Sequence, residues 1–126
     1  MTNSKARTAA MITPVGQEAQ DEARQLVREG RAGKAVRRLR KGSWLKRGAA
    51  REALELLVEG QALPTSSGQA LDVLRTLDAP LVGELTALLG NGQQIAAIKL
   101  LRERTGIDLV GGHHLVLELA GPPDAH

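Results

Sequence analysis

Apolar residues recur every three to four positions along most of this chain, and polar or glycine-containing breaks separate the apolar runs. That spacing predicts a succession of amphipathic helices, the first of which is expected to begin at Thr13 and Pro14. The expected helices span residues 14–29, 31–41, 48–59, 69–77, 80–90, 92–105 and 109–120. No segment alternates apolar and polar residues over the length of a strand. The pattern therefore predicts an all-α fold of six or seven short helices without a β-sheet.

Residues 91–109, with the sequence NGQQIAAIKLLRERTGIDL, carry the clearest local signals for a helix and its ends. Asn91 is expected to cap the helix, with Gln94 reaching back to it in a capping box. Gly106 is expected to end the helix in a left-handed conformation, and Asp108 is expected to cap the next one. The apolar positions expected to face the core are Ile95, Ile98 and Leu101. The segment thus predicts a helix, a tight turn and a second helix.

This helix pair resembles the helix-turn-helix core of the C-terminal domain of the bacterial ribosomal stalk protein of the L-seven/L-twelve class. The similarity covers residues 94–119 and is carried by Ala97, Ile98, Lys99, Arg102, Thr105, Gly106 and Leu109. In that family the two helices recruit translational GTPases to the ribosome. The resemblance therefore implies a partner-binding surface formed by Ile98, Lys99, Arg102, Gly106 and Leu109.

The chain departs from the pattern of that family in several places, one of which is Gln94 in place of a frequent Lys. After Leu109 the family usually continues with Lys-Glu-Ala-Lys, whereas residues 110–113 are Val, Gly, Gly and His. The strands that flank this core in the family are not predicted here, because residues 84–89 have a helical pattern. The resemblance therefore carries over the helical core and only part of the partner-binding surface.

The sequence also aligns with itself at one constant offset. Along this alignment, the residues Leu26, Gly30, Ala35, Leu39 and Arg40 match Leu88, Gly92, Ala97, Leu101 and Arg102. A chance match is one explanation, because amphipathic helices of similar composition share a pattern without shared ancestry. We favour the other, that the chain contains two copies of one three-helix unit, each with a helix-turn-helix pair.

This interpretation divides the chain into five parts. Residues 1–13 are polar and are expected to be disordered. Residues 14–60 form a first, basic unit, and residues 69–121 form a second unit that contains the stalk-like core. The Gly, Pro and Ser content of residues 61–68 is typical of a linker. Residues 122–126 are expected to form a tail.

The net charge of +3 conceals an uneven distribution. Residues 1–51 contain 13 Lys or Arg and 4 Asp or Glu, whereas residues 52–126 contain 4 and 10, so the two parts carry +9 and −6. The residues expected to bind nucleic acid or another polyanion, here called the basic stripe, are Lys34, Arg37, Arg38, Arg40, Lys41, Lys46 and Arg47. Two other roles stay open for the basic stripe: a solvated helix face, or an internal contact with the acidic part of the chain.

The composition excludes several classes of functional site. Without cysteine, the chain has no disulfide, no thiolate nucleophile and no cysteine-ligated metal. Trp44 is the only aromatic residue, and we expect it to fill the core of its unit, with an interface as the alternative. His113 and His114 are adjacent and point about 100° apart on a helix, so they do not chelate one ion together. We therefore expect no enzymatic activity, no catalytic residue, no metal and no cofactor.

The cellular location is predicted from what the sequence lacks. No run of about 18 apolar residues is present to span a membrane, and residues 1–13 lack the apolar segment of a signal peptide. A sequence without cysteine is compatible with a reducing compartment. We expect a cytoplasmic protein with no membrane partner.

Two functions from different classes are consistent with these observations. The first is a non-enzymatic protein-interaction module that docks a partner, such as a translational GTPase or another component of translation, through the stalk-like helix pair. The alternative is a helical protein that binds nucleic acid through its basic first unit. The salt dependence of binding to DNA or RNA duplexes separates the two.

Overall fold

The computed structural model describes residues 4–121, which form eight helices and no strand. The helices are α1 (Ser4–Met11), α2 (Gln17–Arg28), α3 (Ala32–Arg40), α4 (Arg47–Val58), α5 (Ser67–Leu77), α6 (Ala79–Gly90), α7 (Gln94–Thr105) and α8 (Leu109–Ala120). The predicted all-α class is confirmed over this range. The number of helices differs from the predicted six or seven, because α1 forms in a segment that we expected to be disordered. The predicted tail at residues 122–126 lies outside the described residues.

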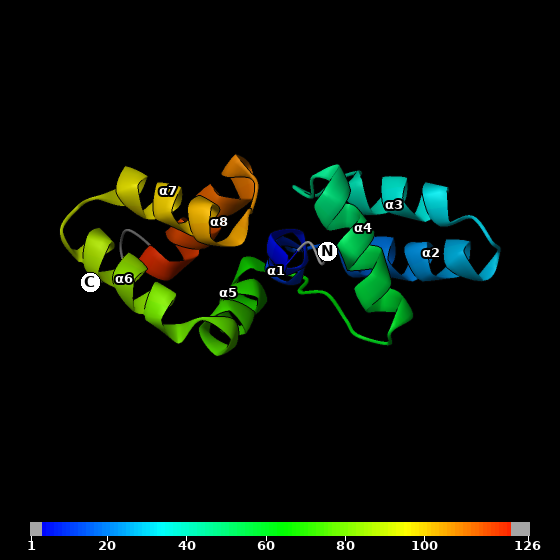
Figure 1. Cartoon of the computed structure of the whole chain (residues 1–126), viewed down its shortest axis with the longest axis horizontal. Helices are drawn as coiled ribbons and strands as arrows, with labels where there is room; N and C mark the ends of the chain where they lie inside the picture. Colours follow the sequence, from blue (N-terminus) through cyan, green and yellow to red (C-terminus); the bar gives the residue numbers. More distant parts are fainter. Residues whose placement is uncertain (1–3, 122–126) are drawn as a thin grey trace.

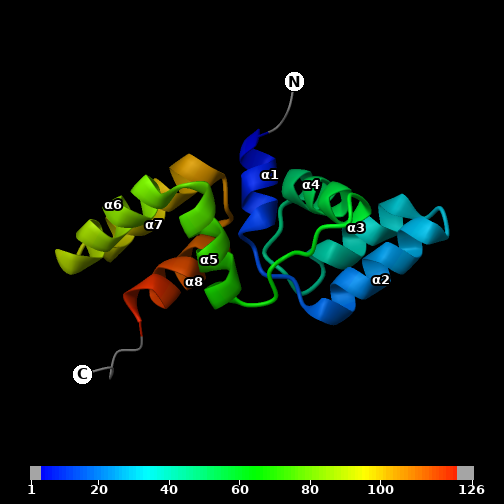
Figure 2. The same cartoon turned by 90° about the horizontal axis from the view of Figure 1, so that it is seen from below.

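The helices pack into two lobes, and α1 lies between them (Figures 1 and 2). The first lobe consists of α2, α3 and α4, with α1 packed on α4, and the second consists of α5 to α8. The first core contains many small side chains, among them Ala23, Ala35, Leu39, Ala50 and Leu56. The second core contains larger ones, among them Leu74, Leu81, Leu85, Leu101 and Leu115. Each lobe therefore has a buried apolar core of its own.

The segment around α1 contributes to both cores. Ala9 and Ala10 lie in the first core, whereas Ile12, just after the helix, is fully buried in the second. The prediction of disorder is therefore wrong for residues 4–13. Alanine contributes little to a hydrophobic pattern along a sequence, yet it is among the residues most often buried. For this reason the sequence pattern did not reveal the buried side of α1.

Arg7 ties α1 to the end of α4, whereas Thr13 bonds back to α1 itself. Arg7 donates a hydrogen bond to Glu59, the residue that follows α4, at 3.0 Å, and this bond raises the pKa of the Arg7 guanidinium. Thr13 Oγ1 donates to the carbonyl of Ala9 at 2.6 Å, so Thr13 completes α1 and does not cap the next helix. The predicted helix start at residue 14 is wrong, because α2 begins at Gln17.

The turn between α6 and α7 differs from the predicted capping box. Asn91 ends α6, and Gly92 adopts a φ of +74°, which is the conformation that terminates a helix. The helix α7 begins at Gln94 without a side-chain cap. The prediction failed because a glycine between two helices fits the end of one as well as the start of the next. The two helix ends predicted at Gly106 and Asp108 are confirmed.

Helix boundaries in the two lobes correspond to each other. The first residues of α2, α3 and α4 stand at one constant offset before the first residues of α6, α7 and α8. Turn hydrogen bonds recur at the same offset, because the Arg31 N–H donates to the Leu26 carbonyl and the Gln93 N–H donates to the Leu88 carbonyl, both at 2.8 Å. The interpretation that one unit was duplicated remains a prediction.

Candidate polyanion-binding face

The helices α3 and α4 present basic side chains on the outer surface of the first lobe. Ala35 and Leu39 of α3 are fully buried, so the opposite side of this short helix faces solvent. Arg37 and Arg40 lie on the exposed part of α3, and Arg47 is the first residue of α4. Because α3 packs against α4, the basic residues of the two helices come close together.

Four arginine side chains surround one hollow between α3 and α4, which we call the arginine hollow. It has a volume of about 250 Å³ and is lined by Gly33, Val36, Arg37, Arg40, Arg47 and Arg51. None of these four arginines forms an ion pair with another described residue. Their positive charges are therefore uncompensated, and this arrangement favours an anionic ligand.

The amino end of α4 adds to the positive potential of the arginine hollow. Its N-cap residue is Lys46, whose side chain accepts no hydrogen bond from the first N–H groups of the helix. Free N–H groups at a helix start carry partial positive charge and bind anions. Lys46 and Arg47 are both exposed at this end. The backbone and the side chains therefore favour an anion at the same place.

The structure changes the predicted basic stripe at two positions. Arg38 is half-buried and forms an ion pair with Glu22 of α2, so its charge is engaged within the lobe and the stripe is not uniformly free. Arg51 also lines the hollow but was not among the residues predicted for the stripe, although its spacing one turn after the preceding arginine of α4 was an available signal. Lys34 and Lys41 are exposed and line a shallow hollow beside the first one, as expected of residues open to a ligand.

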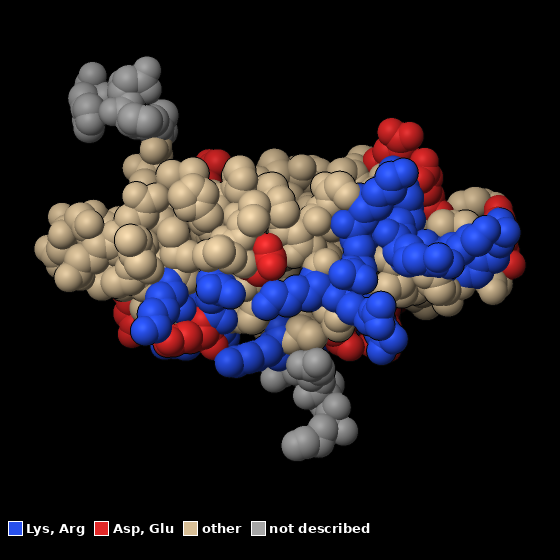
Figure 3. All heavy atoms as spheres, turned by 90° about the horizontal axis from the view of Figure 1, so that it is seen from above, with Lys and Arg blue, Asp and Glu red and all other residues tan. Residues whose placement is uncertain are grey.

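The basic surface extends beyond the arginine hollow. Figure 3 shows Lys and Arg side chains in a nearly continuous band across one face of the molecule, over the first lobe and onto the second. Asp and Glu side chains lie mainly along the margins of this band in the same view. A band of this length matches a ligand with many negative charges better than a single small anion.

Most of the predicted partner-binding residues lie on the surface of α7 and α8. Lys99, Arg102 and Leu109 are exposed, and Ile98 is half-buried. Neither basic residue forms an ion pair within residues 4–121. Arg104 of the same helix differs, because it lies 3.5 Å from carboxylate oxygens of both Asp78 and Glu84. Lys99 and Arg102 are therefore the basic residues of α7 that are open to a partner.

The α7–α8 surface has the same place in its lobe as the arginine hollow, but a different chemistry. At the constant offset, the lining of the arginine hollow corresponds to Ile95, Ile98, Lys99, Arg102, Leu109 and His113. Leu109 and His113 thus replace two arginines, and Ile95 replaces a glycine. Ile95 is 84% exposed, so the prediction that it faces the core is wrong. This second surface combines exposed apolar side chains with two cations that have no ion pair in the described part of the chain.

Trp44 and Gly106 lie at the junction between the lobes. The Trp44 ring stacks on His114 of α8, with the ring centroids 4.4 Å apart and the planes at 12°. A Cβ added at Gly106 would lie 3.3 Å from Cβ of Lys5 in α1. The expectation that Trp44 fills the core of its own unit is wrong, because it is half-buried between lobes. Gly106, predicted to bind a partner, is half-buried against α1.

No metal site is formed by the described residues. His113 and His114 are exposed, and their rings meet edge to face with the ring centroids 6.1 Å apart. Residues 4–121 contain no group of three or more His, Cys, Asp or Glu that could hold a metal ion. None of the described helices is long and apolar enough to cross a membrane.

Comparison with known proteins identifies no relative. No family model, curated protein or solved structure matches the chain. The similarity of α7 and α8 to the ribosomal stalk family therefore stays a prediction drawn from the residues themselves.

Proposed function

We propose that the protein binds nucleic acid through the phosphate backbone, with the arginine hollow at the centre of the contact. The observation that carries this proposal is the set of four guanidinium groups around one hollow, none of which has an acidic partner among the described residues. A guanidinium binds phosphate oxygens through two parallel hydrogen bonds, and contacts with phosphate carry no sequence information directly. Each neutralised phosphate also releases a counterion, which drives association.

Two features favour a duplex over a single-stranded chain. The basic band in Figure 3 is long, and a duplex presents phosphates at short, regular intervals along such a surface. Single strands bind by stacking their bases on aromatic side chains. Trp44 is the only aromatic residue, and it is already stacked on His114. The surface therefore fits the outside of a paired nucleic acid.

The basic residues have different roles in this proposal. The four arginines of the hollow contact phosphates directly. Around them, Lys34, Lys41 and Lys46 extend the positive potential and raise the rate of encounter. Arg38, paired with Glu22, holds α3 on α2. None of these roles requires a catalytic group or a cofactor, so we propose a non-enzymatic binding protein, and the cytoplasm remains its expected location.

A salt titration of duplex binding tests this function. We expect the logarithm of the association constant for a DNA or RNA duplex to fall linearly with the logarithm of salt concentration, with a slope of about −3 to −4 for four phosphate contacts. Fluorescence anisotropy of labelled duplexes between about 50 and 200 mM salt measures this slope. A labelled polyglutamate peptide is the control for an acidic protein partner. Absence of duplex binding at the lowest salt, or tighter binding of the peptide, would overturn the proposal.

A second candidate function is docking of a protein partner on the α7–α8 surface. The observation that favours it is the exposure of Ile95 and Leu109 beside the unpaired Lys99 and Arg102. Apolar contacts with flanking charges fit an amphipathic, acidic segment of another protein. A translational GTPase as that partner rests on the stalk resemblance alone.

Charge reversal on α7 tests this second candidate. We expect Lys99→Glu with Arg102→Glu to remove a co-purifying partner, because two attractive contacts become repulsive. Thermal stability should change little, since exposed charges contribute at most about 1 kcal/mol to folding. Arg104→Glu is the matched control, because it removes ion pairs to Asp78 and Glu84 and should retain the partner. A double variant that keeps its partner but melts much earlier would show that Lys99 and Arg102 have a structural role.

We also propose that the two lobes arose from one duplicated unit whose surfaces then diverged. The support is the constant offset between helix starts and between turn hydrogen bonds in the two lobes. Under this proposal the unit contains four helices, because α1 packs on α4 as α5 packs on α8. The equivalent surfaces on α3–α4 and α7–α8 would then serve a polyanion and a protein, respectively.

A further inference from the structure

We propose that a slot between α2 and α4 of the first lobe binds a small amphiphilic carboxylate, with its apolar chain between the helices and its carboxylate on Arg24 and Arg28. The slot has a volume of about 210 Å³ and is lined by Arg24, Val27, Arg28, Leu54, Leu57 and Val58. This site is separate from the arginine hollow, with which it shares no lining residue. The proposal does not depend on nucleic-acid binding.

The walls of the slot are apolar from the core to the rim. Leu54 and Leu57 are buried members of the first core, and Val27 is half-buried beside them. Val58, at the end of α4, is 64% exposed at the rim. A large apolar side chain this open to water is stabilised by an apolar ligand that covers it. The slot therefore favours a hydrocarbon chain over a polar ligand.

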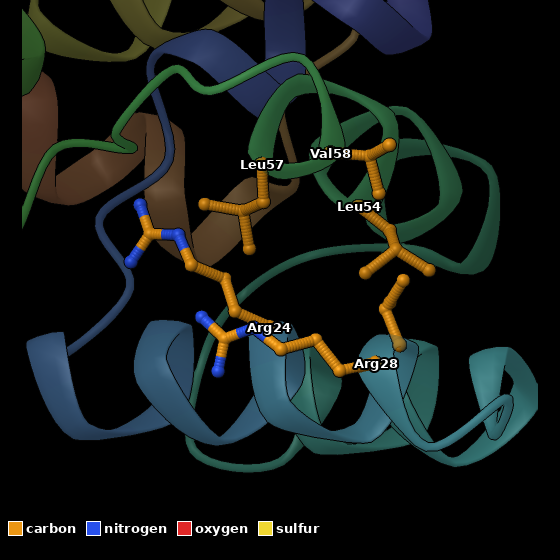
Figure 4. A pocket seen from close by; sticks show the side chains of 6 residues that line it. Arg24, Arg28, Leu54, Leu57 and Val58 are labelled. Atoms are coloured by element: carbon orange, nitrogen blue, oxygen red, sulfur yellow. The ribbon is translucent and has the colours of Figure 1, made fainter.

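One end of the slot carries two cations. Figure 4 shows the guanidinium groups of Arg24 and Arg28 lying toward the same end, with Leu54, Leu57 and Val58 on the opposite helix. The Arg24 guanidinium is positioned by an ion pair with Asp21, in which Nη1 lies 3.2 Å from Oδ1 of the carboxylate. The two guanidinium groups together carry one more charge than that carboxylate, and they are suited to bind an anionic head group.

Arg28 supplies the free charge at this end. The only side-chain hydrogen bond of Arg28 among the described residues is donated to Oε1 of Gln25, at 2.8 Å, and this neutral group leaves the charge of the guanidinium uncompensated. At the constant offset, the second lobe has Thr86 and Gly90 in place of Arg24 and Arg28. The same pair of helices therefore packs in the second lobe without either cation, so these arginines are not required to hold the helices together.

The size of the slot limits the ligand. A volume of 210 Å³ equals about seven water-sized groups at roughly 30 Å³ each. This accommodates a short hydrocarbon chain with a carboxylate. Because the rim at Val58 is open, a somewhat longer chain can extend along the surface. Octanoate is therefore a suitable probe.

Titration of the full chain with sodium octanoate tests the proposal. We expect saturable binding of one octanoate per chain by calorimetry, with amide NMR shifts confined to residues of α2 and α4. Octanamide, which has the same chain and a neutral head, should bind at least about tenfold more weakly, because the charge-assisted hydrogen bonds are lost. Acetate, which lacks the chain, should not saturate. Equal binding of octanoate and octanamide, or no saturable binding of octanoate, overturns the proposal.

Variants of the two ends of the slot locate the ligand. Arg24→Gln with Arg28→Gln should weaken octanoate binding by about tenfold or more, and Val58→Asp should also weaken it by placing a like charge at the rim. Arg37→Gln with Arg40→Gln removes the same charge from the arginine hollow and should leave the octanoate affinity unchanged. Circular dichroism checks that each variant is folded. If the double variant is less stable than the parent protein, the single variant Arg28→Gln replaces it in the binding measurement. Octanoate binding that is insensitive to Arg28→Gln and to Val58→Asp rules out this slot.

Discussion

Replacing three arginines of the hollow, by Arg37→Gln, Arg40→Gln and Arg47→Gln together, should weaken duplex binding by about 30- to 100-fold at physiological salt. None of these side chains has an acidic partner within residues 4–121, so each variant position loses a phosphate contact of its own. The slope of the salt titration should become less steep by about 2.7, since each phosphate contact contributes roughly 0.9. Anisotropy measurements on the parent and the variant give both quantities.

A matched control removes the same charge elsewhere. Arg31, Arg75 and Arg104 each have a carboxylate within 4.0 Å, so their replacement by glutamine removes charges that are already largely neutralised. This control triple should change duplex affinity by less than about threefold. If both triples weaken binding equally, the protein responds to net charge alone, and the hollow has no special role. The control triple should lower the free energy of unfolding by at most about 1 kcal/mol for each ion pair that it removes. The hollow triple removes no ion pair of the described residues and should lower it by no more than that.

Ile12→Ala should lower the free energy of unfolding of the whole protein by about 2 to 5 kcal/mol. Ile12 is fully buried in the second core, while Ala9 and Ala10 of the same segment are buried in the first. The substitution should therefore destabilise both lobes. Urea denaturation followed by circular dichroism and by Trp44 fluorescence measures it, because the fluorescence reports the junction where Trp44 stacks on His114. The two probes should give the same midpoint, as expected for one cooperative unit.

The control for this experiment is Leu77→Ala, at the end of α5. Leu77 is 44% exposed, so its truncation should cost less than about 1 kcal/mol. A loss at Ile12 no larger than at Leu77 would show that the lobes are not coupled through α1. Separate midpoints for the two probes would lead to the same conclusion.

Local signals in the sequence were sufficient where one residue decides the outcome. Gly106 ends α7 because its positive φ suits glycine, and Asp108 caps α8 because its carboxylate accepts a backbone hydrogen bond. The same approach failed at Asn91, where two helix ends compete for one short polar segment. It also failed at α1, whose buried face consists mostly of alanine.

Long-range packing decided the features that the sequence did not predict. Ile95 follows the helical spacing of the core positions, but it lies in the first turn of α7, where no neighbouring helix covers it. Trp44 is at a junction that no local pattern encodes, because its partner is His114 of the other lobe. Most of the basic stripe was found because Lys34, Arg37, Arg38 and Arg40 lie at helical spacing within α3, whereas Arg51 joins them only through packing of α4. The α2–α4 slot combines residues from two helices that are not adjacent in sequence.

The placement of Ile12 also constrains the order of events during biosynthesis. Ile12 is translated before every helix of the second lobe, yet its buried environment is built from those helices. A nascent chain that ends before α5 can assemble the first core around Ala9 and Ala10, but it leaves Ile12 facing water. The first lobe thus carries an exposed apolar side chain until the second lobe has emerged from the ribosome, and such transient exposure favours aggregation. Truncated chains should accordingly depend on chaperones more than the full chain does.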